Sequence, residues 1–172
     1  MAKKDSVIAN KLDQLSKLQE IHTKIDQIQI LKGELPIEVA DLEDEIAGMN
    51  TRLNKIQTEI TDSNELIITR NNTIKDANAL ITRYERQLDT VKNNREFDAL
   101  SKEIELQKLD VKISEKKIKE ATSSIDYSKG LLDDLKSKID IKNDNLAAKN
   151  KELGHIVAET EKEEVELTKN SE

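Results

Sequence analysis

The sequence predicts an all-α protein: a long antiparallel coiled-coil hairpin, two helices joined by one turn. The first observation is composition, because 37% of the 172 residues are charged and 2% are aromatic, with 4 Gly and 1 Pro. That balance is typical of long helices and coiled coils. The second is that apolar residues recur at alternating intervals of three and four, which is heptad spacing. The third is that this spacing keeps one phase on both sides of a central polar turn.

The composition also argues against several classes of protein. The net charge of −7 disfavours a general nucleic-acid binder, since phosphate contacts need clustered Lys and Arg. No Cys is present, so these residues form neither a disulfide nor a thiolate metal site. No apolar run is long enough for a transmembrane helix, and "MAKKDSVIANKL" lacks the apolar segment of a signal peptide. We therefore expect a cytoplasmic protein without membrane contact.

The first half of the chain is predicted to form an N-terminal helix over 1–32 and a first arm over 36–91. Between them, "LKGELP" suggests a kink or break at about 33–36, because Gly33 ends a helix and Pro36 starts one. The apolar seam keeps its phase across this segment. It consists of Leu18, Ile21, Ile25, Ile28, Lys32, Leu35, Val39, Leu42, Ile46, Met49, Leu53, Ile56, Ile60, Ser63, Ile67, Arg70, Ile74, Ala77, Ile81, Tyr84, Leu88 and Val91.

The second arm is predicted over 95–168, with a seam of the same alternation. A stretch poor in helix-forming residues, Ala121–Gly130, leaves open whether this arm is broken there. The seam residues are Phe97, Leu100, Ile104, Gln107, Val111, Ser114, Ile118, Ala121, Ile125, Ser128, Leu132, Leu135, Ile139, Lys142, Leu146, Lys149, Leu153, Ile156, Thr160, Glu163 and Leu167.

Folding the chain back on itself brings the two seams into one register. Val91 meets Phe97, Leu88 meets Leu100, and the matching continues to Ile21 with Leu167. Several layers pair a large residue with a small or polar one, among them Ile74 with Ser114, Ala77 with Val111, Ser63 with Ile125, and Ile60 with Ser128. Two unrelated heptad helices need not share a phase, so residues 1–172 are predicted to form a single elongated hairpin domain.

The turn is predicted at about 92–96, within "VKNNREFDALSKEIE". Asn tolerates the left-handed backbone conformation that a turn between helices can require. Asn93 or Asn94 is expected to cap the second arm, and Asn93 with Glu96 has the spacing of a capping box. Phe97, the single phenylalanine, is expected to close the end of the hairpin against Val91.

No residue pattern indicates catalysis, a cofactor site or a metal site in this chain, so we do not expect an enzyme. His22 and His155 lie about 16 Å apart along the axis of the predicted hairpin, too far to share a metal ion. The acidic runs "DLEDE" and "EKEE" are typical of solvated coiled-coil faces.

Two surfaces are candidates for binding. The tip is a dense mixture of polar and charged residues around one aromatic ring, and it suggests a partner-binding site; it comprises Lys92, Asn93, Asn94, Arg95, Glu96 and Phe97. The second surface faces away from the seam, where exposed apolar residues suggest self-association as a homodimer or, as the alternative, contact with a different partner. It comprises Leu106, Leu109 and Ile113.

Three blocks of the chain resemble a bacterial coiled-coil family that ends in a C4-type zinc ribbon. They occur in the family's order and span nearly the whole chain: "LSKLQEIHTKIDQI", "ELPIEVADLEDEI" and "VKNNREFDALSKEIE". The third is the most specific, since NN-R-E-aromatic-x-A-L is more than a heptad demands. In that family a helical hairpin precedes two Cys-x-x-Cys pairs that bind zinc. This sequence departs from the pattern because it has no Cys, so the resemblance implies zinc only in a ribbon beyond residue 172.

The resemblance implies a non-enzymatic scaffold or adaptor. Some members of that family resemble adaptors that bind an alternative sigma factor or components of flagellar or type III export systems, and others are nucleic-acid binders. The alternative is a nucleic-acid-binding protein in which the hairpin accompanies the ribbon. The tip region does not favour that alternative, because its charges nearly balance: Arg83, Arg86, Lys92, Arg95 and Lys102 against Glu85, Asp89, Glu96 and Asp98.

Overall fold

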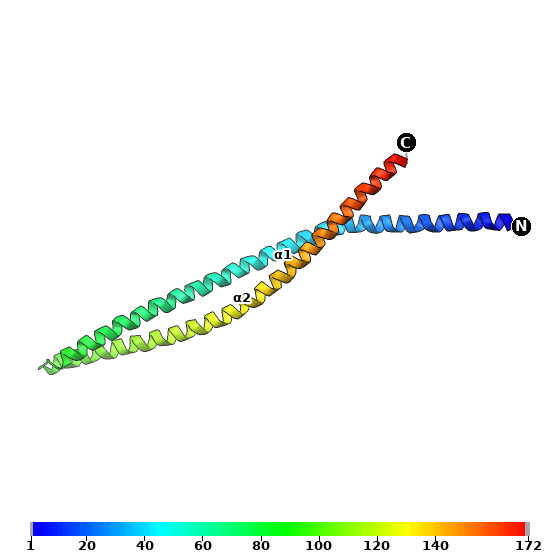
Figure 1. Ribbon diagram of the computed structural model, residues 1–172. Helices are drawn as coiled ribbons and strands as arrows, with labels where there is room; N and C mark the ends of the chain where they lie inside the picture. The colour runs from blue at the N-terminus through cyan, green and yellow to red at the C-terminus, as the bar shows by residue number, and fades with distance from the viewer. Residues whose placement is uncertain (1, 171–172) are drawn as a thin grey trace. The chain divides into compact units, whose positions relative to one another are not determined.

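The computed structural model describes residues 2–170 and contains two α-helices that pack against each other as a hairpin (Figure 1). The first helix, α1, spans Ala2–Leu88, and the second, α2, spans Asn94–Asn170. Side chains are described except at 2, 164 and 167–170. The all-α hairpin predicted from the heptad seams is confirmed.

The chain divides into two compact units, and each contains a part of both helices. The terminal unit consists of Met1–Gly48 and Ile139–Glu172. The turn unit consists of Met49–Lys138 and holds the connection between the helices.

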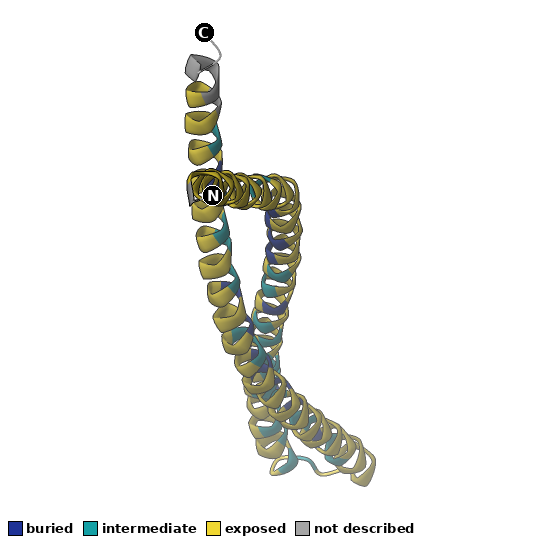
Figure 2. Cartoon of the chain, turned by 90° about the vertical axis from the view of Figure 1, so that its right-hand side faces the viewer, coloured by how far each residue is buried: buried dark blue, intermediate teal, exposed yellow. Residues whose placement is uncertain are grey.

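The predicted seams form the core of each unit. All seam positions from Leu35 to Val91 and from Leu100 to Thr160 are buried or half-buried, and Figure 2 shows these residues as dark blue and teal bands on otherwise exposed helices. In the terminal unit the buried apolar residues are Leu35, Val39, Leu42, Ile46, Ile139 and Ile156. In the turn unit they are Ile56, Ala77, Ile104, Ala121, Ile125 and Leu135, together with the buried hydroxyl residues Ser114 and Ser128.

Two ion pairs between the helices fix the register of the terminal unit. The Lys149 ammonium lies 2.6 Å from the Glu38 carboxylate, and the Lys142 ammonium lies 3.1 Å from that of Glu45. The predicted register places each lysine opposite the residue that follows its glutamate partner. The two glutamates are seven residues apart on α1, and the two lysines are seven residues apart on α2. Both lysines occupy seam positions, and their charged ends reach the edge of the interface.

The predicted break at 33–36 does not occur, because α1 remains helical through Gly33 and Pro36. Figure 1 shows the axis of α1 changing direction in this part of the helix, so of the two predicted possibilities the kink is the one observed. Pro36 removes one backbone hydrogen bond, which costs a helix about 3 kcal/mol. Leu35 and Val39 are buried on either side of it, and each buried side chain of this kind contributes about 1.5–3 kcal/mol. Packing therefore keeps the segment helical. The stretch Ala121–Gly130 is likewise unbroken within α2.

The predicted seam, which begins at Leu18, is not buried at its N-terminal end. Leu18 and Ile21 are 52% and 53% exposed, and within the terminal unit the blue end of α1 and the red end of α2 diverge (Figure 1). The next two seam residues, Ile25 and Ile28, are half-buried, although the register places them opposite the polar residues Glu163 and Thr160. The predicted partner of Ile21, Leu167, lies outside the described side chains.

Candidate functional site at the hairpin turn

The connection between the helices lies earlier in the chain than predicted. α1 ends at Leu88 and α2 begins at Asn94, so the turn occupies 89–93 and not 92–96. The Thr90 N–H donates to the Gln87 carbonyl (3.2 Å) and the Val91 N–H to the Leu88 carbonyl (3.4 Å). These short-range bonds tighten and end α1. Arg95 and Glu96 consequently lie in the first turn of α2.

Asn93 is the N-cap of α2. Its side-chain Oδ1 accepts a hydrogen bond of 2.9 Å from the Arg95 N–H, and its carbonyl accepts one of 3.0 Å from the Phe97 N–H. The cap is simpler than the predicted capping box. In a capping box the Asn93 N–H would also donate to the Glu96 side chain, and the hydrogen bonds of the described residues do not include this one. Every described residue has negative φ, so the left-handed conformation expected of the asparagines is not needed.

Phe97 does not close the hairpin against Val91. It is 48% exposed, whereas Val91 is half-buried. The reason is the early end of α1, because Val91 already belongs to the turn and no helix continues opposite Phe97. Phe97 therefore presents about half of its surface to solvent within the first turn of α2.

The structure gathers the six predicted tip residues at one end of the turn unit, and all six are exposed. Beside them lies a shallow groove of about 390 Å³, lined by Gln87, Thr90, Val91, Glu96, Ala99 and Leu100. Glu96 is the one predicted tip residue in this lining. Sequence reasoning missed Gln87, Thr90 and Ala99, which become neighbours only because the turn begins at 89. It also missed the guanidinium of Arg83, 5.5 Å from the ring centre of Tyr84.

The second predicted surface is exposed on α2, also within the turn unit. Leu106, Leu109 and Ile113 are 55%, 52% and 41% exposed. The seam residues on either side of them, Ile104 and Ser114, are buried, and the seam residues between them, Gln107 and Val111, are half-buried. The three apolar side chains thus lie on the face of α2 opposite the seam, where the heptad assignment puts them.

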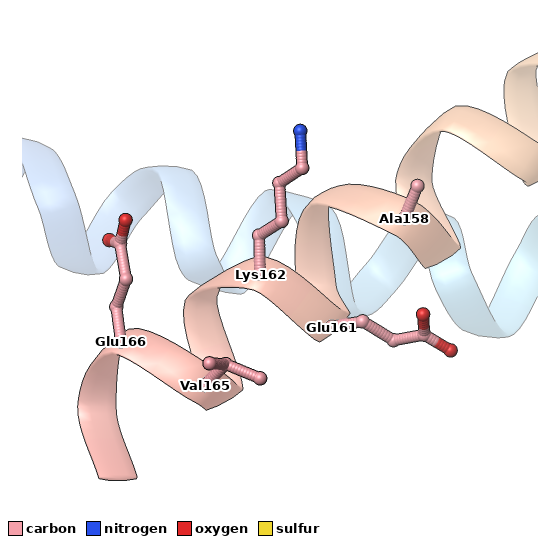
Figure 3. A pocket seen from close by; sticks show the side chains of 5 residues that line it. All are labelled: Ala158, Glu161, Lys162, Val165 and Glu166. Atoms are coloured by element: carbon pink, nitrogen blue, oxygen red, sulfur yellow. The ribbon is translucent and has the colours of Figure 1, made fainter. Parts of the chain in front are cut away.

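A further groove, of about 440 Å³, lies in the terminal unit and is lined from α2 alone by Ala158, Glu161, Lys162, Val165 and Glu166. Figure 3 shows that these side chains point in different directions and do not converge on a common point. Among the described residues there is no group of three or more His, Asp or Glu arranged to hold a metal ion. No described helix is long and apolar enough to cross a membrane.

No protein-family model matches the chain, and neither a curated protein nor a solved structure matches it.

Proposed function

We propose that the chain is a non-enzymatic scaffold or adaptor that binds a protein partner through the tip of its hairpin. The observation that carries the proposal is the exposure of Phe97. An aromatic ring placed at a predicted seam position is instead 48% exposed at the end of the hairpin, with Arg95 two residues before it. Aromatic residues and Arg supply much of the binding energy at protein interfaces.

The local backbone supports this role because it is ordered by hydrogen bonds before any partner arrives. Asn93 caps α2 with its side chain, and Thr90 and Val91 bond back to α1. A pre-ordered surface loses less conformational entropy on binding than a mobile loop does. Lys92, Arg95 and Glu96 surround the ring with charges of both signs, which resembles the polar rim of an interface.

The resemblance of "VKNNREFDALSKEIE" to the zinc-ribbon coiled-coil family supports a partner of the kind that family binds. Under this proposal the protein is bacterial and cytoplasmic, and its partner is a sigma factor or a component of a secretion or flagellar system.

The test compares what the chain recovers from nuclease-treated cell extract before and after the tip is changed. Replacing Arg95 and Phe97 together with Ala should greatly reduce recovery of the partner. Tyr127→Ala is the matched control, because it removes a 70% exposed aromatic ring elsewhere in the turn unit. It should leave recovery unchanged, and circular dichroism should show equal helicity in all three proteins.

Equal recovery by the tip variant and the control would overturn the proposal. Binding that disappears with nuclease and falls steeply with salt would instead identify a nucleic acid as the ligand. The nearly balanced charges around the tip make that result unexpected.

A further inference from the structure

We infer that the outward face of α2 binds the same face of a second copy in antiparallel orientation. The face is centred on Leu106, Leu109 and Ile113 and bounded by charges that complement themselves when one copy is reversed. The inference concerns a different surface from the tip and does not rest on the proposed function.

The apolar centre of this face follows from helical geometry. Residues three and four apart lie on one side of a helix, so Leu106, Leu109 and Ile113 form one short stripe. Their exposures of 55%, 52% and 41% leave a large fraction of each side chain in water. Nothing else in the turn unit covers them.

The two edges of the stripe carry charges in a definite order along the helix. At 3.6 residues per turn, Glu105 and Lys116 lie along one edge, and Glu103 and Lys117 lie along the other. All four are exposed, and none of them belongs to the ion pairs found among the described residues. Each edge is therefore negative toward the turn and positive farther along α2.

This order is complementary to itself only when the second copy is reversed. A twofold axis between Leu109 and Asp110 places Leu106 opposite Ile113 of the other copy, and it brings each edge against the same edge. Glu105 then faces Lys116, and Glu103 faces Lys117, each pair occurring twice. Like charges also meet in this pairing: the two copies of Asp110 approach each other at the axis, and exposed Lys102, four residues before Leu106, lies near Lys117 of the other copy in both halves of the contact. The four opposite-charge pairs still outnumber these three like-charge contacts.

A parallel pair would have the opposite electrostatics. Each edge would meet the other edge of the second copy, so Glu105 would lie near Glu103, and Lys116 near Lys117. Like charges held close together across an interface oppose association. The charge pattern therefore selects both the partner, a second copy of this chain, and its orientation.

The contact contains three large apolar side chains from each copy, which places it at the small end of specific interfaces. We expect a dimer whose dissociation constant is micromolar or larger. Sedimentation velocity of the whole chain from about 1 μM to 1 mM, the range in which weak complexes dissociate, should show a shift from monomer to dimer. Leu109→Glu should remain monomeric throughout, while Ile68→Glu, a change at a 62% exposed residue of α1, should behave as the wild type does.

Charge exchange tests the orientation. Glu103→Lys with Glu105→Lys makes both edges positive, and Lys116→Glu with Lys117→Glu makes both negative, so either double variant should weaken dimerisation at least tenfold. The quadruple variant reverses the order on each edge and should restore it. Circular dichroism should show that every variant remains helical.

A wild-type chain that stays monomeric throughout this range would overturn the inference. So would double variants that dimerise as the wild type does, since a parallel pair keeps like charges together whichever sign they have. A quadruple variant that dimerises no more tightly than the double variants would overturn the inference as well.

Discussion

Ser114→Ala should make the protein more stable, although it removes a polar group from the packed interface. Ser114 is 1% exposed, and its Oγ has no hydrogen-bond partner. The hydroxyl of Thr122, by contrast, donates to the Ile118 carbonyl at 2.8 Å. A buried polar group without a partner costs about 1–3 kcal/mol. Ser114 therefore destabilises the turn unit as it stands.

The net change can be estimated from three contributions. Removing the unpaired hydroxyl recovers about 1–3 kcal/mol, and alanine is the better helix former by about 0.5 kcal/mol. The void left by one oxygen atom, on the order of 20 Å³, costs about 0.5 kcal/mol at roughly 24 cal/mol per Å³. The free energy of unfolding should thus increase by about 1–3 kcal/mol.

The assay is urea unfolding followed by circular dichroism at a helix-sensitive wavelength. The midpoint should rise while the slope stays constant, because the area exposed on unfolding hardly changes. Ser128→Ala is the matched control: Ser128 is 9% exposed and its hydroxyl is not a buried unpaired atom, so only the helix-propensity gain remains. A midpoint for Ser114→Ala at or below that of the wild type would show that the hydroxyl is satisfied, and would refute the reasoning.

Three further predictions concern single side chains. Asn93→Ala should cost about 0.5–2 kcal/mol in urea unfolding, because the cap of α2 is lost; an equal cost for Asn94→Ala would contradict this assignment. Gly130→Ala should raise the free energy of unfolding by about 0.8–1 kcal/mol, since a Cβ there meets nothing within 4 Å; a loss of stability would contradict the local packing. The hydrogen bond to Glu38 raises the pKa of Lys149 above its ordinary 10.5, so its stabilising effect should be present below pH 10.5 and disappear as the pH rises further. As the pH rises through this alkaline range, the free energy of unfolding should decrease less for Glu38→Gln than for the wild type.

The core of the fold could be read from the sequence because heptad spacing reports directly which side of a helix is buried. The seams from Leu35 to Val91 and from Leu100 to Thr160 depend on that spacing alone. Their common phase also gave the register that the pairs Glu38–Lys149 and Glu45–Lys142 now mark.

The local features that sequence reasoning missed depend on competition between interactions. Gly33 and Pro36 signal a helix end, but the burial of Leu35 and Val39 outweighs that local preference. At the tip, hydrogen bonds from Thr90 and Val91 decide where α1 stops, and propensities do not resolve such small differences. The exposure of Phe97 follows from that stop, so it could not be predicted from the heptad pattern.

Leu18 and Ile21 illustrate a different limit. Their spacing marks them as seam residues, yet they are 52% and 53% exposed, and their predicted partners at 170 and 167 lie outside the described side chains. A periodic pattern on one helix predicts which face could be buried. Whether it is buried depends on the other helix.

The central claim is that one chain folds back on itself in this register, and a crosslink across the terminal unit tests it most directly. The chain has no cysteine, so Glu38→Cys with Lys149→Cys introduces the only thiols, at positions whose native side chains lie 2.6 Å apart. A short bismaleimide at low protein concentration should link them within one chain. Glu38→Cys with Lys142→Cys is displaced by seven residues, about 10 Å along the helix, and should react poorly. Links only between chains, or equal linking in both variants, would contradict the hairpin and its register.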